Sequence, residues 1–100
     1  MIQVELKNNQ KYEVNSVSEN YTPAGGESAP RHTLNIDLGG KAARNLDMET
    51  LIASFTEENI SLVNVYDDGE LAASFSGYAT PCFAKTIGSQ GLTFRIMAAK

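Results

Sequence analysis

The fold of this 100-residue chain is decided by residues 60–71, which read ISLVNVYDDGEL. β-branched and aromatic side chains are concentrated before the turn, and such residues favour the pleated backbone of a strand. Asp68-Gly69 is the dipeptide typical of a two-residue type I′ turn, in which both central residues need positive φ. The segment therefore predicts a β-hairpin whose first strand lies centrally in a sheet and is buried on both faces.

The turn also predicts which residues face each other across this hairpin. A two-residue loop at this position puts Tyr66 opposite Leu71 and Leu62 opposite Phe75. Residues directly opposite in an antiparallel pair lie on the same face of the sheet. We therefore expect these four side chains to form one apolar cluster.

Alternating apolar and polar residues predict further strands on both sides of the hairpin, because a period of two puts one set on a core and the other in water. The second predicted strand pairs back on the first and is bulged near residues 15–16. Pro81 cannot donate to a central ladder, so the strand that begins at Glu70 should kink or end near it. The predicted strands, besides that hairpin, cover residues 2–6, 11–17, 34–38, 82–87 and 92–96.

One short helix is predicted at about residues 47–56. Asp47 is a good N-cap, and Leu46 and Leu51 occupy the positions of a hydrophobic staple around it. Apolar residues spaced by three and four then form a stripe that should pack on the sheet. This stripe comprises Met48, Leu51, Ile52 and Phe55.

These elements predict one α+β domain spanning residues 1–100. We expect a mainly antiparallel β-sheet, curled into a sandwich or small barrel, that carries the one short helix. The composition, with 42% hydrophobic and 20% charged residues, is that of an ordinary globular protein.

Residues 18–32, SENYTPAGGESAPRH, have no apolar periodicity and predict a long flexible loop or arm. Most connections in a compact domain are about 4 to 6 residues long, and longer ones are often functional. Tyr21 is an aromatic side chain in a polar segment, which suits either a tether or an anchor for a partner. The candidate interaction residues on this arm are Tyr21, Pro23, Gly25, Gly26, Pro30, Arg31 and His32.

The sequence offers few groups for catalysis. His32 is the only histidine and Cys82 the only cysteine, and a catalytic histidine needs a nucleophile or an orienting carboxylate. We expect His32 to be exposed in the loop and Cys82 to be buried as a small apolar side chain. No phosphate-binding or metal-binding motif is present, so we predict a chain that is not an enzyme and uses no cofactor or metal.

Charge and hydropathy limit the partners and the compartment. A formal charge of −4 provides no basic surface for nucleic acid. No apolar stretch approaches the 18 or more residues of a membrane span, and residues 1–7 alternate rather than form a signal peptide. A single cysteine suits a reducing compartment, so we expect a cytoplasmic protein.

Several segments resemble small prophage-encoded proteins of Gram-positive bacteria. These segments are LDM (46–48), FTEENIS (55–61), the Asp68-Gly69 turn and SGY (76–78). The resemblance implies a structural or accessory role in a phage, in the tail or baseplate, where small β-rich domains with extended loops assemble into rings. It would place the protein in the virion and implies no catalytic residue.

Two functional hypotheses follow. The first is a non-enzymatic structural or protein-interaction module, whose arm and free strand edges contact copies of itself or other assembly components. The alternative is a β domain that binds a small ligand or a peptide in an apolar cavity between sheet and helix.

Overall fold

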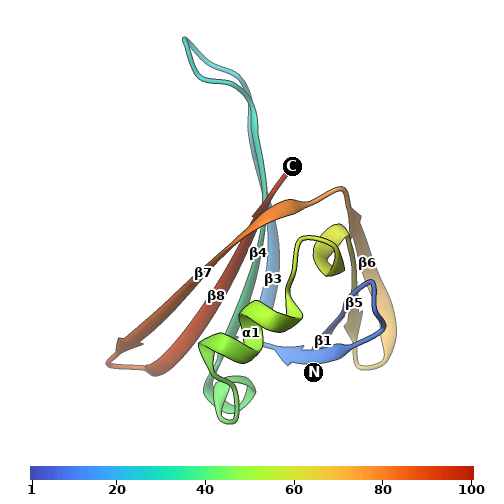
Figure 1. The fold of residues 1–100 in the computed structure, drawn as a ribbon. Helices are drawn as coiled ribbons and strands as arrows, with labels where there is room; N and C mark the ends of the chain where they lie inside the picture. Colours follow the sequence, from blue (N-terminus) through green and yellow to red (C-terminus); the bar gives the residue numbers. More distant parts are fainter.

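The computed structural model describes all 100 residues and contains two four-stranded antiparallel sheets arranged as a sandwich (Figure 1). Sheet A has the strand order β2-β1-β5-β6, and sheet B has the order β3-β4-β8-β7. The predicted fold class is confirmed, with a sandwich rather than a closed barrel. The strands are β1 (Ile2–Glu5), β2 (Lys11–Val14), β3 (Ser16–Thr22), β4 (Arg31–Gly39), β5 (Leu62–Asp67), β6 (Glu70–Ser76), β7 (Ala79–Gly88) and β8 (Gly91–Ala99).

The chain passes between the two sheets at their edges. β1 and β2 form the predicted opening hairpin, with Ile2 opposite Val14. The prediction of a single strand over residues 11–17 is wrong, because the chain leaves sheet A at Asn15 and Val17 belongs to β3 of sheet B. Val14 and Val17 therefore face the same core from two different sheets, which explains the break in alternation between them.

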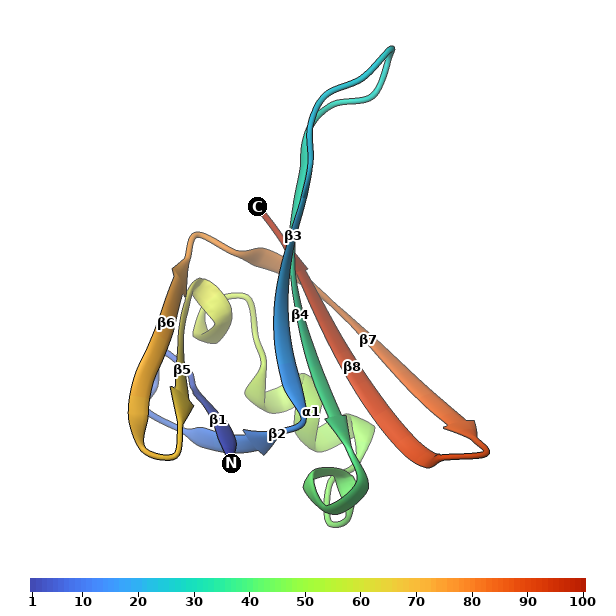
Figure 2. The same cartoon turned by 180° about the vertical axis from the view of Figure 1, so that it is seen from behind.

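The predicted helix is α1 (Met48–Ser54), and the carboxylate of Asp47 accepts a hydrogen bond from the backbone N–H of Thr50 at 2.7 Å. In both views α1 lies in the angle between the two sheets (Figures 1 and 2). Leu51 is buried, whereas Ile52 is 50% exposed. The assignment of Ile52 to the packed stripe is wrong because a seven-residue helix presents only a narrow face to the core. None of the helices has the length and apolar character needed to cross a bilayer.

A single apolar core holds the sandwich together. Its 16 buried residues come from both sheets, from α1, from the two short 3-10 helices, Gly40–Ala43 and Asn59–Ser61, and from the connections between these elements. No polar or charged residue is fully buried. The largest fully buried side chains are Tyr78, Phe55, Phe94, Leu6, Leu34, Leu38, Leu51, Ile60 and Ile96.

The β5–β6 hairpin contains a bulge that changes its register. Tyr66 is opposite Leu71 as predicted, but the register shifts between Val65 and Tyr66. Leu62 therefore faces Ser76 rather than Phe75, so the predicted cluster of four is wrong. A bulge inserts an extra residue in one strand, which no turn rule anticipates.

The position of β5 in the sheet is central, as predicted, but its burial is on one face only. Val63 and Val65 face the core, and Leu62 is 39% exposed on the other side. The prediction of burial on both faces is wrong because no second layer covers the outer face of sheet A.

The strand β7 is one of the two outer strands of sheet B, where Pro81 removes no central ladder bond. A register shift between Ala79 and Cys82, together with a φ of 55° at Thr80, marks a second bulge. From Cys82 to Gly88 the pairing with β8 is then regular.

Two neighbouring helix residues test the packing of α1. We expect Leu51→Ala to lower the free energy of unfolding by about 2 to 5 kcal/mol, because it leaves a cavity in the core. Ile52→Ala should change it by no more than about 0.5 kcal/mol, because the side chain is half-exposed. Urea unfolding followed by circular dichroism measures both, and equal losses would contradict this packing of α1.

Candidate functional site: the arm and its base

The arm (residues 18–32) is a β-hairpin that extends from the body of the sandwich (Figures 1 and 2). Its interpretation as an unstructured loop is wrong, because residues 18–22 belong to β3 and residues 31–32 to β4. Only residues 23–30 lie outside the strands. The apolar periodicity is missing because this part of the hairpin has no core beneath it.

The ladder of the arm ends at two prolines. Thr22 pairs with Arg31 as the last regular pair. The same register would place Pro23 opposite Pro30, and neither residue has a backbone N–H to donate. The strands therefore end where the hydrogen-bond donors are missing.

Beyond the prolines, the tip closes in a tight turn. The backbones of Gly25 and Ser28 exchange two hydrogen bonds, of 3.2 and 2.8 Å. Gly26, between them, has a φ of 56°, which glycine adopts without steric cost. The tip is therefore a defined turn that stands in solvent.

All seven residues predicted for interaction lie on the arm. Six of them are exposed, and Tyr21 exposes 62% of its surface. His32 is partly buried, contrary to the expectation of an exposed loop histidine, because it lies at the base of the arm. Their role in binding stays a prediction.

A polar cluster joins the arm to the body. We call Glu19, His32, Tyr78 and Lys100 the arm-base cluster. The hydroxyl of Tyr78 donates to Oε2 of Glu19, and Nε2 of His32 lies 3.1 Å from the same oxygen. The other carboxylate oxygen, Oε1, makes no hydrogen bond and no ion pair within the chain.

Aromatic and backbone contacts strengthen this junction. The His32 ring packs edge-on against Tyr21 and Tyr78, with ring centres 5.4 and 5.6 Å apart. The N–H of Lys100 donates to the carbonyl of His32 at 3.0 Å, and its Nζ lies 5.0 Å from the centre of the Tyr78 ring. The arm is thus held by the C-terminus and by the connection between β6 and β7.

The electrostatics of the cluster follow from these contacts. The hydrogen bond from Tyr78, and then the nearby His32, hold the pKa of Glu19 below its ordinary value of 4.5. Burial, and then the hydrogen bond and charge of Glu19, raise the pKa of Tyr78 well above its ordinary value. Glu19 is therefore held ionised as an acceptor, and Tyr78 is held protonated as a donor.

Cys82 lies apart from this cluster. It is exposed, so the prediction of a buried thiol is wrong. It is opposite Met97, whose chain neighbours Ile96 and Ala98 are both buried, so Cys82 lies on the outer face of sheet B. His32 shares the parity of the buried Leu34 and lies on the inner face, so the fold separates imidazole and thiol.

Two members of the cluster, Glu19 and Tyr78, cannot be recognised from local sequence patterns. Glu19 is one polar residue among many in residues 18–32. Tyr78 lies in the short connection between β6 and β7, where no alternating pattern marks it. The two are 59 positions apart, so only the tertiary fold brings them together.

Two shallow hollows lie elsewhere, on the outer face of sheet B. They have volumes of about 270 and 250 Å³, and Asp37 and Arg95 line both. Asp37 is directly opposite Arg95, yet its Oδ1 has no hydrogen-bond partner. The remaining lining is short and mostly hydroxyl or amide, namely Ser16, Ser18, Asn20, Asn35, Ala84, Thr86 and Thr93. No three His, Cys, Asp or Glu side chains are grouped closely enough to hold a metal ion.

Comparison with family models, with curated proteins and with solved structures found no match for this chain.

The arm-base cluster predicts a pH-dependent contribution to stability. A carboxylate with a lowered pKa stabilises the fold above its unfolded pKa, and this stabilisation is lost as the pH falls through the folded pKa. We expect Tyr78→Phe to lower the free energy of unfolding at pH 7, and the deficit to shrink as the pH falls through the lowered folded pKa of Glu19. Urea unfolding of both proteins at several pH values measures this.

The matched control is Tyr21→Phe. Tyr21 lies on the same arm and is largely exposed, and its hydroxyl makes no hydrogen bond. This variant should leave stability unchanged at every pH. A deficit of Tyr78→Phe that does not shrink anywhere in the acid range over which Glu19 becomes protonated would contradict the proposed bond to ionised Glu19.

Proposed function

We propose that this chain is a non-enzymatic assembly module, which contacts other proteins through its arm and through the free edges of sheet B. The observation that carries the proposal is the arm itself, a two-stranded ribbon whose tip stands clear of the body (Figures 1 and 2). An isolated two-stranded hairpin is only marginally stable in water. Contact with a partner would cover it, and Tyr21 provides a large exposed side chain for that contact.

The edges of sheet B support the same proposal. β3 and β7 are its outer strands, so each has one row of backbone groups without a partner strand. Such edges are templates for pairing with another chain. β7 extends over ten residues and presents Ile87 with 78% of its surface exposed.

The non-enzymatic part of the proposal rests on the surroundings of the one histidine. His32 contacts Glu19, Tyr21 and Tyr78, and all of these contacts hold the arm to the body. Neither hollow of the surface is lined by His32. The contacts of Glu19 and His32 thus serve to hold the arm to the body.

The proposed partners are other copies of the chain or other components of an assembly. A prophage tail or baseplate is the setting that the resemblance of residues 46–78 suggests. The alternative of a small-ligand or peptide domain gains no support from the cavities, because both lie on the outer face of sheet B and are lined almost entirely by polar residues. The space between sheet and helix is occupied by the apolar core.

Removal of the tip tests the proposal. Replacing residues 23–30 by Asn-Gly joins the paired residues Thr22 and Arg31 by a two-residue turn and leaves the arm-base cluster intact. We expect the free energy of unfolding to change by less than about 0.5 kcal/mol, because the tip makes no contact with the core. The molar mass in solution, or the amount of partner bound, should fall.

Multi-angle light scattering and sedimentation velocity measure the mass over a range of concentrations. A variant of equal length, in which residues 23–30 are kept and Glu27 is changed to Gln, controls for the loss of charge. An unchanged mass together with unchanged partner binding would remove the tip from the assembly.

A further inference from the structure

We propose that copies of this chain join through sheet B, with β3 of one copy pairing antiparallel with β7 of the next and Glu19 opposite Lys85. The proposal rests on the proposed assembly function and names its partner, a second copy. It follows from the strand directions, the strand lengths and the side chains at the two free edges of sheet B.

The strand directions allow the sheet to continue from copy to copy. Each neighbouring pair in the order β3-β4-β8-β7 is antiparallel. Three reversals make β7 antiparallel to β3, so β3 of a second copy in the same orientation follows β7 as the next antiparallel strand. The inner faces of the two sheets then lie on the same side.

The two free edges have matching lengths. β3 comprises seven residues, Ser16–Thr22. The regular part of β7, after its bulge, runs from Cys82 to Gly88 and also comprises seven residues. One register pairs all seven positions, with Thr22 opposite Cys82 at one end and Ser16 opposite Gly88 at the other.

That register places complementary side chains opposite each other on the inner face. It places the aromatic Tyr21 opposite Phe83, the acidic Glu19 opposite the basic Lys85, and Val17 opposite Ile87. Cross-strand aromatic, ionic and β-branched pairs all stabilise a sheet. A shift by two residues, which keeps the same faces together, would put Glu19 opposite Phe83 or Ile87.

The outer face matches as well, because small side chains meet there. The register pairs Asn20 with Ala84 and Ser18 with Thr86, so no bulky or charged group is opposed. When two copies join in this way, their outer faces would form one continuous polar surface, which includes the two hollows of each copy.

Both charged groups keep capacity for the contact. Lys85 has no carboxylate within 4.0 Å in its own chain, and its Nζ lies 5.8 Å from the centre of the Phe94 ring. Glu19 uses Oε2 for Tyr78 and His32, which leaves Oε1 for a neighbour. The arm-base cluster therefore presents an oriented carboxylate to the next copy.

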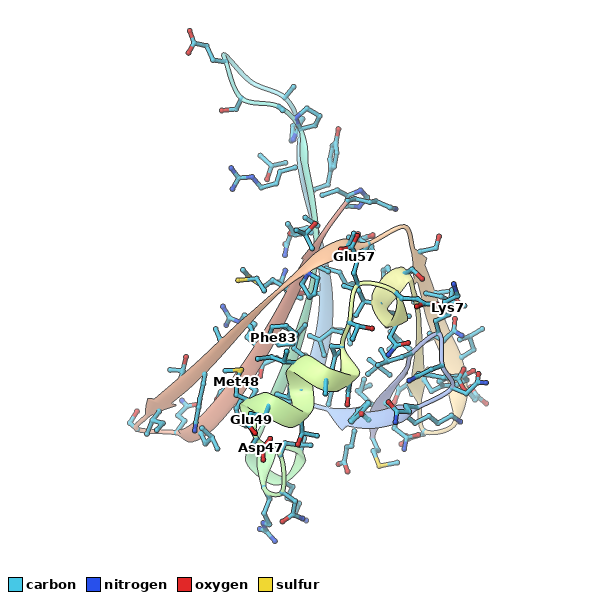
Figure 3. All side chains as sticks on the ribbon, viewed as in Figure 1. Lys7, Asp47, Met48, Glu49, Glu57 and Phe83 are labelled. Carbon is cyan, nitrogen blue, oxygen red and sulfur yellow. The ribbon has the colours of Figure 1, made fainter.

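The contact also explains the exposed apolar groups of both edges. Phe83 lies near Met48, where β7 meets α1 (Figure 3), and is only partly buried. Ile87 and Tyr21 are 78% and 62% exposed. Strand pairing would cover all three. Because the two surfaces differ, the contact is heterologous and generates rings or filaments rather than a closed two-fold dimer.

The native cysteine provides a test of the register. In a sheet joined as proposed, Thr22→Cys brings a second thiol directly opposite Cys82 of the neighbouring copy. Within one chain the two positions are three strand spacings apart, more than about 14 Å, which a disulfide cannot span. Oxidation with copper phenanthroline should therefore link Thr22→Cys into a ladder of dimers, trimers and larger species on non-reducing gels.

Two variants control this experiment. Asn20→Cys carries its thiol on the same face of the same strand but opposite Ala84, so it should crosslink at least several-fold less. The double variant Thr22→Cys with Cys82→Ser should not form the ladder. Circular dichroism checks that the variants are folded. Thr22 and Asn20 are exposed residues of β3, and Cys82 is an exposed residue of β7.

The outcomes separate this proposal from the broader one. Equal crosslinking of Thr22→Cys and Asn20→Cys, or dimers alone, would overturn the register or the head-to-tail contact. Assembly by light scattering without any crosslinked ladder would overturn the strand pairing and leave the assembly function standing. A monomer at all concentrations, with no ladder, would overturn both for copies of this chain.

The charge pair is tested by Lys85→Glu. We expect it to weaken self-association roughly 3- to 10-fold, because it exchanges an attractive cross-strand pair for a repulsive one. Lys41→Glu makes the same change of net charge on the exposed 3-10 helix and should have little effect. An equal effect of both variants in sedimentation equilibrium would show that net charge, rather than the Glu19–Lys85 contact, controls association.

Discussion

The structure depends on the pairing of β4 with strands on both of its sides. β4 hydrogen-bonds to β3 along one edge and to β8 along the other, while Leu34, Ile36 and Leu38 anchor it in the core. The pairing with β8 ends at Thr33, but the pairing with β3 continues. From Tyr21 and His32 onward, the arm therefore lacks β8 as a neighbour. Its base belongs to the four-stranded sheet B, and its outer part is supported only by its own ladder.

The arm-base cluster compensates for the lost support. Glu19 lies opposite Leu34, and His32 lies just past the last pair of β4 with β8. Their side chains hold the two strands of the arm to Tyr78. Tyr78 is itself almost completely buried, so the direction of the arm is tied to the core. A polar junction of this kind fixes orientation better than an apolar one, because hydrogen bonds require particular geometries.

Local signals in the sequence predicted the local structure well. The Asp68-Gly69 turn and the Asp47 cap were identified because each depends on neighbouring residues only. The bulge after Val65 was missed, because an extra residue in a strand follows from packing across the sheet. The arm-base cluster was missed for the same reason, since Glu19 and Tyr78 meet only when two sheets are assembled. The sequence located the arm but not its strands, because apolar alternation reports burial rather than hydrogen bonding.

This distinction between burial and hydrogen bonding bears on the function of β3. Its residues 18–22 form a strand although they bury little surface, so the ladder with β4 alone keeps them extended. The outer edge of this strand has unpaired backbone groups, an oriented carboxylate oxygen on Glu19 and an exposed ring on Tyr21. The hydrogen-bonding groups on this edge are therefore not used within the chain. In the assembly that we propose, the edge of β7 would provide the complementary side chains, Lys85 and Phe83, over the same number of residues.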